Sequence, residues 1–147
     1  MKSSPQIDES QFLKDLEDLR QFGLQADGAV HRVGYSPTDL EAREWLNGRL
    51  RQLGLDPQWD AAGTSFALYG GLKEVAPIGV GSHSDTVPYG GAYDGALGVV
   101  AALAVIEALH TAGVRLNHPL EWINFAAEEA TMAGGTTGSQ ALTGIFN

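Results

Sequence analysis

The segment from Gly95 to Thr111 reads GALGVVAALAVIEALHT, and it is the clearest indicator of the fold. It is too long for a strand, it is rich in Ala and Leu, and Gly113 follows it where a helix C-cap is favoured. We therefore predict a helix. Apolar runs flank it, from Ile78 to Val80 and from Leu120 to Ala127, and each is predicted to be a strand. Strand, helix and strand form a βαβ unit with parallel strands and a right-handed crossover.

The rest of the chain extends this unit into an α/β fold. The spacing of apolar residues predicts a helix from Ser10 to Phe22 and a second helix that Ser36 caps and that ends at Gly54. Residues Thr64 to Tyr69 are predicted to form a further strand, with a turn at Gly70 and Gly71. We expect a three-layer α/β/α fold, with a mixed, largely parallel sheet and helices on both faces.

Imidazole and carboxylate side chains follow both strands of the βαβ unit. His83 and Asp85 come after the first strand, Glu128 and Glu129 come after the second, and Asp94 opens the connecting helix. Because the carboxyl ends of parallel strands share the sheet edge that binds ligands in open α/β sheets, these side chains are predicted to converge. One imidazole with carboxylates suits zinc or manganese, and the chain has no Cys to favour a softer ion.

Each of these residues also has a plainer explanation. His83 could be a hydrogen-bonded loop residue, Asp94 could be a helix N-cap, and Glu128 and Glu129 could be solvated acids in a turn. In a metal site, by contrast, Asp85 can fix the tautomer of His83, and of two adjacent acids one can bind metal while the other moves a proton. Their shared position on one predicted edge favours the metal site.

The motifs resemble the dinuclear-metal hydrolases of the M20-type metallopeptidase clan that include N-carbamoyl-L-amino acid hydrolases, allantoate amidohydrolases and ureidoglycolate hydrolases. The segment GSHSDTVPYGGAYDGALGV, residues 81–99, is close to the metal-binding signature of that family, and FAAEE, residues 125–129, resembles its next block. Ten residues separate His83 from Asp94. Related peptidases and deacylases usually have a longer stretch there, so the spacing favours the carbamoylase and ureidohydrolase branch.

The resemblance implies a zinc-peptidase-like catalytic domain with two divalent ions, either zinc or manganese, with cobalt and nickel as further candidates. It implies that His83 binds one ion, Glu129 binds the other and Asp94 bridges both. Glu128 is then the general base, and Asp85 orients His83. The implied reaction is hydrolysis of linear amide C–N bonds in N-carbamoyl amino acids or in ureido compounds such as allantoate, through a water that bridges the ions.

The resemblance also sets expectations for the chain as a whole. Family members continue past the position of Asn147 into a lid and dimerisation domain and carry two further His ligands, so residues 1–147 are expected to be the N-terminal portion of a metallohydrolase catalytic domain. By itself this portion is expected to bind metal weakly and to turn over little. The alternatives are an inactive fragment, a subunit of a split enzyme, or a related peptidase or deacylase. A cis peptide bond is expected between Asp94 and Gly95.

Composition limits the partners. The chain has 9 basic and 18 acidic residues and a net charge of −9, which argues against nucleic acid. It has no uncharged apolar run of eighteen residues and no signal-like amino terminus, so we expect no membrane association and a cytoplasmic location. The expected partners are a small-molecule substrate and either a second copy or a complementing chain. His31, His110 and His118 are expected to be structural or exposed.

Overall fold

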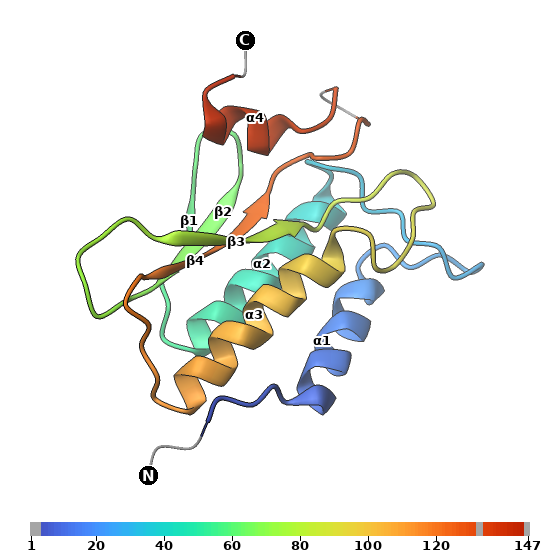
Figure 1. Ribbon diagram of the computed structural model, residues 1–147. Helices are drawn as coiled ribbons and strands as arrows, with labels where there is room; N and C mark the ends of the chain where they lie inside the picture. The colour runs from blue at the N-terminus through green and yellow to red at the C-terminus, as the bar shows by residue number, and fades with distance from the viewer. Residues whose placement is uncertain (1–3, 132–133, 146–147) are drawn as a thin grey trace.

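The computed structural model describes residues 4–131 and 134–145 of the protein (Figure 1). The helices are α1 (Glu9–Gln21), α2 (Pro37–Gln52), α3 (Ala96–Thr111) and α4 (Thr137–Thr143). The strands are β1 (Gln58–Trp59), β2 (Ser65–Tyr69), β3 (Ile78–His83) and β4 (Leu120–Phe125). The strand order in the sheet is β1-β2-β4-β3. The α/β class and the mixed sheet are therefore confirmed.

The strand directions differ from the expected, largely parallel sheet. Among the strands of the described residues, only β3 and β4 pair in parallel, whereas β2 pairs antiparallel with both β1 and β4. Parallel neighbours need a crossover connection, and in the described ranges only α3 provides one between paired strands. The turn between β1 and β2 reverses the chain instead. The βαβ unit is thus the one parallel element, and it carries the predicted site.

The longer helices begin where the sequence predicts them, to within a residue or two. The side chain of Asp8 accepts a hydrogen bond from the backbone of Gln11 and caps α1, and Ser36 caps α2 by accepting one from Asp39, with Pro37 in the first turn. Neither β1 nor α4 was predicted. A strand of two residues and a helix of seven are too short to show a hydrophobic period.

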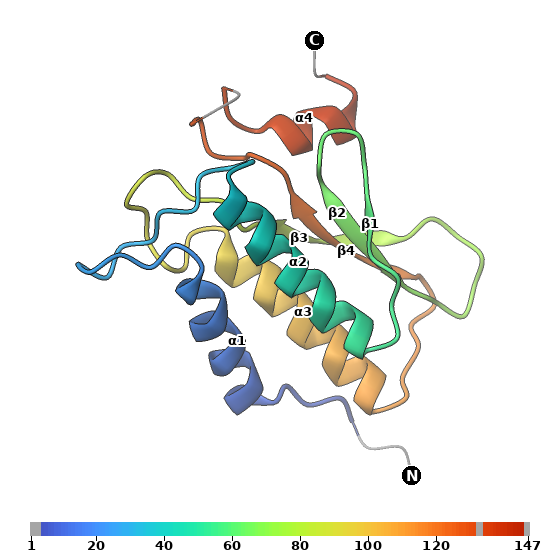
Figure 2. The same cartoon turned by 180° about the vertical axis from the view of Figure 1, so that it is seen from behind.

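Three helices cover one face of the sheet (Figures 1 and 2). Helix α3 lies against β3 and β4, α2 lies against β2, and α1 packs on α3. The core between the helices and the sheet is apolar, and its fully buried members include Leu46, Leu50, Val99, Leu103, Ile106 and Trp122. The indole nitrogen of Trp122 donates to the carbonyl of Val99 at 3.0 Å, so even the largest core side chain has its polar atom paired.

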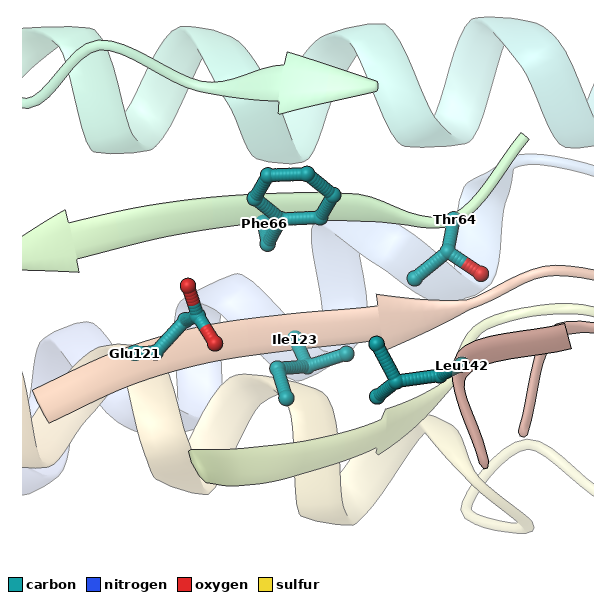
Figure 3. Close-up of a pocket in the computed structure, with 5 residues that line it drawn as sticks. All are labelled: Thr64, Phe66, Glu121, Ile123 and Leu142. Atoms are coloured by element: carbon teal, nitrogen blue, oxygen red, sulfur yellow. The ribbon is translucent and has the colours of Figure 1, made fainter. Parts of the chain in front are cut away.

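The opposite face of the sheet is covered chiefly at its carboxyl edge, by α4. Figure 3 shows the shallow pocket that forms there, lined by Thr64, Phe66, Glu121 and Ile123 of the sheet region and by Leu142 of α4. Further along β2, Leu68 is 50% exposed. Helices therefore lie on both faces, as expected, but the two layers are unequal. No helix in the described ranges has the length and apolarity needed to cross a bilayer.

Candidate metal centre

Three of the predicted site residues meet at the carboxyl edge of the sheet. His83 ends β3, Asp94 lies two residues before α3, and Glu129 lies in the loop after β4. Each offers one ligand atom, and these atoms all lie within 4.8 Å of one another. His83 and Glu129 are partly buried, whereas Asp94 is exposed. The parallel pairing of β3 with β4 brings these residues together, and their role as metal ligands stays a prediction.

The ring of His83 contacts the backbone of Asp85. Its Nδ1 lies 3.0 Å from the carbonyl oxygen of Asp85, but 3.6 Å from the carboxylate Oδ1 of the same residue. Because a carbonyl oxygen can only accept, this contact places the proton on Nδ1 and leaves the lone pair on Nε2. Nε2 lies 3.9 Å from Oε1 of Glu129. Asp85 therefore contacts His83 through its carbonyl and not through its carboxylate, and its role in orienting a metal ligand stays a prediction.

The carboxylate of Asp85 instead joins the two strand ends. It is fully buried, and its two oxygens accept the backbone amides of Glu128, at 3.2 Å, and Glu129, at 3.1 Å. The chain turns towards it at Ala127, a buried residue with φ of 47°. A left-handed conformation costs a non-glycine residue about 1–3 kcal/mol and persists only where the surroundings enforce it. The turn at Ala127 thus aims both amides at one carboxylate and sets Glu129 relative to β3.

Glu128 does not join the cluster. Its carboxylate accepts hydrogen bonds from Ser139, in the first turn of α4, through the backbone amide at 2.8 Å and the hydroxyl at 2.7 Å. The first amides of a helix have no partner inside it, so a carboxylate is favoured there. Sequence reasoning did not identify Ser139 as a partner of Glu128. The role of Glu128 as general base stays a prediction.

Asp94 does not cap α3. The N-cap residue is Gly95, and no side chain makes a capping hydrogen bond, so the ordinary explanation for Asp94 does not hold. A Cβ on Gly95 would come within 2.4 Å of the His83 ring, which requires glycine at this position. The peptide bond between Asp94 and Gly95 is trans, so the expected cis bond is wrong. Gly95 has φ of 65°, and this glycine conformation makes the sharp turn instead.

The other histidines lie away from this cluster. The ring of His31 packs edge-on against that of Tyr89, and Nδ1 of His118 lies 3.1 Å from the carbonyl of Ala76. His110 is exposed in the last turn of α3. These positions agree with the structural or exposed roles expected from the sequence.

Sequence reasoning gave no role to two buried arginines near the site. Arg32 and Arg43 are each 1% exposed. Burial lowers the pKa of Arg32 to about 10, although the charges of Asp39 and Asp85 oppose this, so Arg32 stays charged at neutral pH. Nε of Arg43 lies 3.0 Å from both carboxylate oxygens of Asp39. Burial also raises the pKa of Asp39, against the charge of Arg43. The spacing of four residues between Asp39 and Arg43 is the signal that could have revealed this pair.

The three clustered residues fit a divalent ion. An imidazole with a free Nε2 and two carboxylates are the borderline and hard donors that zinc and manganese take. The hydrogen bond from Nδ1 of His83 to a backbone carbonyl is the outer contact that metal-binding histidines typically make.

A family model described as peptidase family M28 matches residues 68–144, just over half of the chain. The matched range contains the five residues that the sequence predicted for the site.

Relatives and solved structures match almost the whole chain. The ureidoglycolate hydrolase of Oryza sativa subsp. japonica is 35% identical, covering 97% of this chain and 30% of the relative. The N-carbamoyl-L-amino acid amidohydrolase of Geobacillus stearothermophilus is also 35% identical, and the match covers 89% of this chain and 32% of that relative. A hydantoinase/carbamoylase family amidase from Burkholderia ambifaria aligns with a TM-score of 0.94 at 33% identity, covering 98% of this chain and 36% of that chain. The chain thus spans about a third of the length of these proteins.

Proposed function

The chain belongs to peptidase family M28, and from that premise we propose that it forms the metal-binding part of a hydrolase for linear amides. The substrates would be N-carbamoyl amino acids or ureido compounds such as allantoate, as the names of two similar proteins suggest. The observation that carries the proposal is the cluster of His83, Asp94 and Glu129 at the edge where β3 and β4 end.

His83, Asp94 and Glu129 would hold divalent ions, zinc or manganese by the type of ligand. When bound, such ions supply Lewis-acid chemistry, polarising a carbonyl and making water more acidic. By the motif resemblance, one ion would be held by His83 with Asp94 and the other by Glu129 with Asp94. Further His ligands would come from the part of the relatives that this chain does not span.

The chain's own residues would orient the ligands and move the proton. Glu128 would accept a proton from the attacking water and return it to the leaving nitrogen. The two hydrogen bonds from Ser139 would hold the Glu128 carboxylate while each oxygen keeps a further lone pair. The carbonyl of Asp85 would keep the proton of His83 on Nδ1, so that Nε2 remains the donor atom.

For the whole protein we propose a small-molecule substrate, a cytoplasmic location and either a second copy or a complementing polypeptide as partner. In the described part of the chain, β3 is an edge strand that pairs only with β4. An open strand edge favours pairing with a further strand. Sedimentation velocity measured over a range of concentrations tests for a second copy.

Calorimetric titration with zinc and with manganese tests the metal site directly. His83→Ala, Asp94→Asn and Glu129→Gln are each expected to weaken binding about tenfold or more, since even outer contacts of metal ligands are worth that much. His118→Ala is the matched control, because His118 is exposed and its ring contacts the carbonyl of Ala76 in a loop. If His83→Ala bound metal as tightly as the unmodified chain, the proposed site would be wrong.

The reaction is tested in a chimera in which this chain replaces the matching third of the Geobacillus stearothermophilus relative. We expect ammonia release from N-carbamoyl amino acids or allantoate, and a loss of about 100-fold or more in kcat on Glu128→Gln. An aminoacyl anilide serves as the peptidase substrate. If the chimera cleaved only the anilide, the proposed substrates would be wrong and a peptidase activity would be indicated instead.

A further inference from the structure

The two strand ends that carry the site are each held by a buried arginine. We propose that Arg32 and Arg43 are positioning residues that fix His83 and Glu129 in the relative geometry needed for metal binding. Neither arginine belongs to the cluster. The proposal rests on the proposed metal site.

Arg32 holds the carboxyl end of β3. Its Nε donates to the carbonyl of Ser84 at 2.7 Å, directly between His83 and Asp85. Its Nη1 donates to the carbonyls of Leu19 and Phe22 at the end of α1, both at 2.8 Å. The guanidinium therefore ties the strand end to a helix end by bonds to backbone atoms. A shift of this group would move the backbone on both sides of Ser84.

Arg43 holds the carboxyl end of β4 in the same way. Its Nη1 donates to the carbonyl of Asn124 at 3.1 Å, and its Nη2 donates to that of Phe125 at 2.6 Å. Nη1 also reaches the carbonyl of Gly63 at 3.2 Å. Asp39, one helical turn earlier on α2, binds Nε and so fixes the fork in place. Phe125 is the last residue of β4, two residues before the strained turn at Ala127.

The two ends then meet at Asp85. Its carbonyl binds His83, and its carboxylate binds the amides of Glu128 and Glu129. A displacement of either strand end would therefore change the distance between His83 and Glu129. The planar fork of arginine donates in fixed directions, which lysine cannot reproduce because its ammonium is a single rotatable point charge.

A third arginine on α2 provides the contrast. Arg49 binds Asp15 of α1 at 3.0 Å and Glu107 of α3 at 3.4 Å, so it joins helices through side chains. The residues that it bonds to lie in helices away from the strand ends. Arg43 and Arg49 thus share a helix and carboxylate pairing, but only Arg43 bonds to the strand that leads to the site. A merely structural role would make their variants behave alike.

The experiment compares Arg32→Met, Arg43→Met and Arg43→Lys with the control Arg49→Met. Zinc and manganese affinities are measured by calorimetry on the folded protein, and melting temperatures are measured without metal. We expect the Arg32 and Arg43 variants to lose about 10–100-fold in affinity, the usual effect of removing outer contacts. Arg49→Met is expected to lower the melting temperature while changing the affinity by less than about twofold. Equal affinity in Arg43→Met and the unmodified chain would overturn the proposal.

Amide hydrogen exchange at Glu128 and Glu129 in the metal-free protein provides a second readout. It separates this proposal from the proposed function, because it decides the matter even if the unmodified chain binds no metal. Faster exchange at both amides in Arg43→Met than in Arg49→Met supports positioning, and equal exchange refutes it. If Arg43→Met does not fold, Arg43→Lys takes its place, since it keeps the charge and lacks only the fork.

Discussion

The helix-covered face of the sheet and its carboxyl edge are held by different forces. The face is packed with buried apolar side chains such as Leu46, Leu103 and Trp122. Buried groups at the edge are largely polar, and they include Arg32, Arg43, Ser84, Asp85 and Asn124. Hydrophobic burial has no direction, whereas hydrogen bonds fix distances and angles. We infer that the face contributes most of the folding free energy, whereas the edge fixes the relative positions of the site residues.

The backbone differs between the two regions as well. Two non-glycine residues with positive φ lie at the carboxyl edge, Ala127 with φ of 47° and Thr136 with φ of 50°. Such residues persist where surrounding contacts enforce them, and they are common at functional sites. Changes at the face should therefore alter stability more than metal binding, and changes at the edge should do the reverse.

The largest effect on stability is expected from Trp122→Ala at the face. Removing this fully buried side chain should lower the free energy of unfolding by about 3–5 kcal/mol, because it leaves a cavity in the core. Leu97→Ala on the exposed side of α3 should change it by about 0.5 kcal/mol or less. Denaturant unfolding measures both. If Trp122→Ala weakened metal binding by the folded protein as strongly as changes at the carboxyl edge do, the proposed division of roles between face and edge would be wrong.

Gly95→Ala should give the largest effect on the site. The added Cβ would clash with His83 and would also take an unfavourable positive φ, so metal affinity should fall at least about tenfold. Gly113→Ala is the matched control, because Gly113 has φ of 62° with open space around the added atom. The control should lose about 1 kcal/mol of stability and keep its affinity. Equal affinities in the two variants, measured by calorimetry, would show that Gly95 does not shape the site.

Asp85→Asn should have an intermediate effect. One of the two amides at Glu128 and Glu129 would face an NH2 group instead of an oxygen, so stability should fall by about 1–3 kcal/mol. Asp60→Asn is the control, since the amides of Ala62 and Thr64 both bond to a single oxygen, Oδ1 of Asp60, which asparagine keeps. Thermal unfolding with amide exchange measures both variants. Similar losses of stability in the two variants would mean that the hydrogen bonds of Asp85 to Glu128 and Glu129 do not stabilise the protein more than those of an ordinary loop.

Ser139→Ala should have the smallest effect. It removes one of the two hydrogen bonds to Glu128 and keeps the backbone bond, so stability should fall by about 1 kcal/mol or less. Thr143→Ala, which alters an exposed bond in the same helix, is the control. If Ser139 holds Glu128 for proton transfer, only Ser139→Ala should lower kcat in the chimera. An unchanged kcat would remove Ser139 from the proposed mechanism.

The order of the main helices and strands and the family can be predicted from local features of the sequence. Helix α3 follows from its length and composition, α2 follows from Ser36 and Pro37 at its start, and the resemblance drawn from the motifs at His83 and Glu129 is confirmed by the relatives. Capping, periodicity and motif spacing act over a few residues, so they can be seen along the chain.

The contacts that hold the site in place depend on long-range packing and cannot be predicted from local sequence. The bond from Arg43 to Phe125 spans 82 positions, and that from Glu129 to Asp85 spans 44. Local sequence also does not reveal that His83 contacts the carbonyl of Asp85, or that Glu128 is hydrogen-bonded to Ser139 of α4. The amino-acid type determines which hydrogen bonds a side chain can form. Which partner it meets depends on where distant segments lie once the chain has folded, because buried polar groups bond to whatever the packing brings within reach.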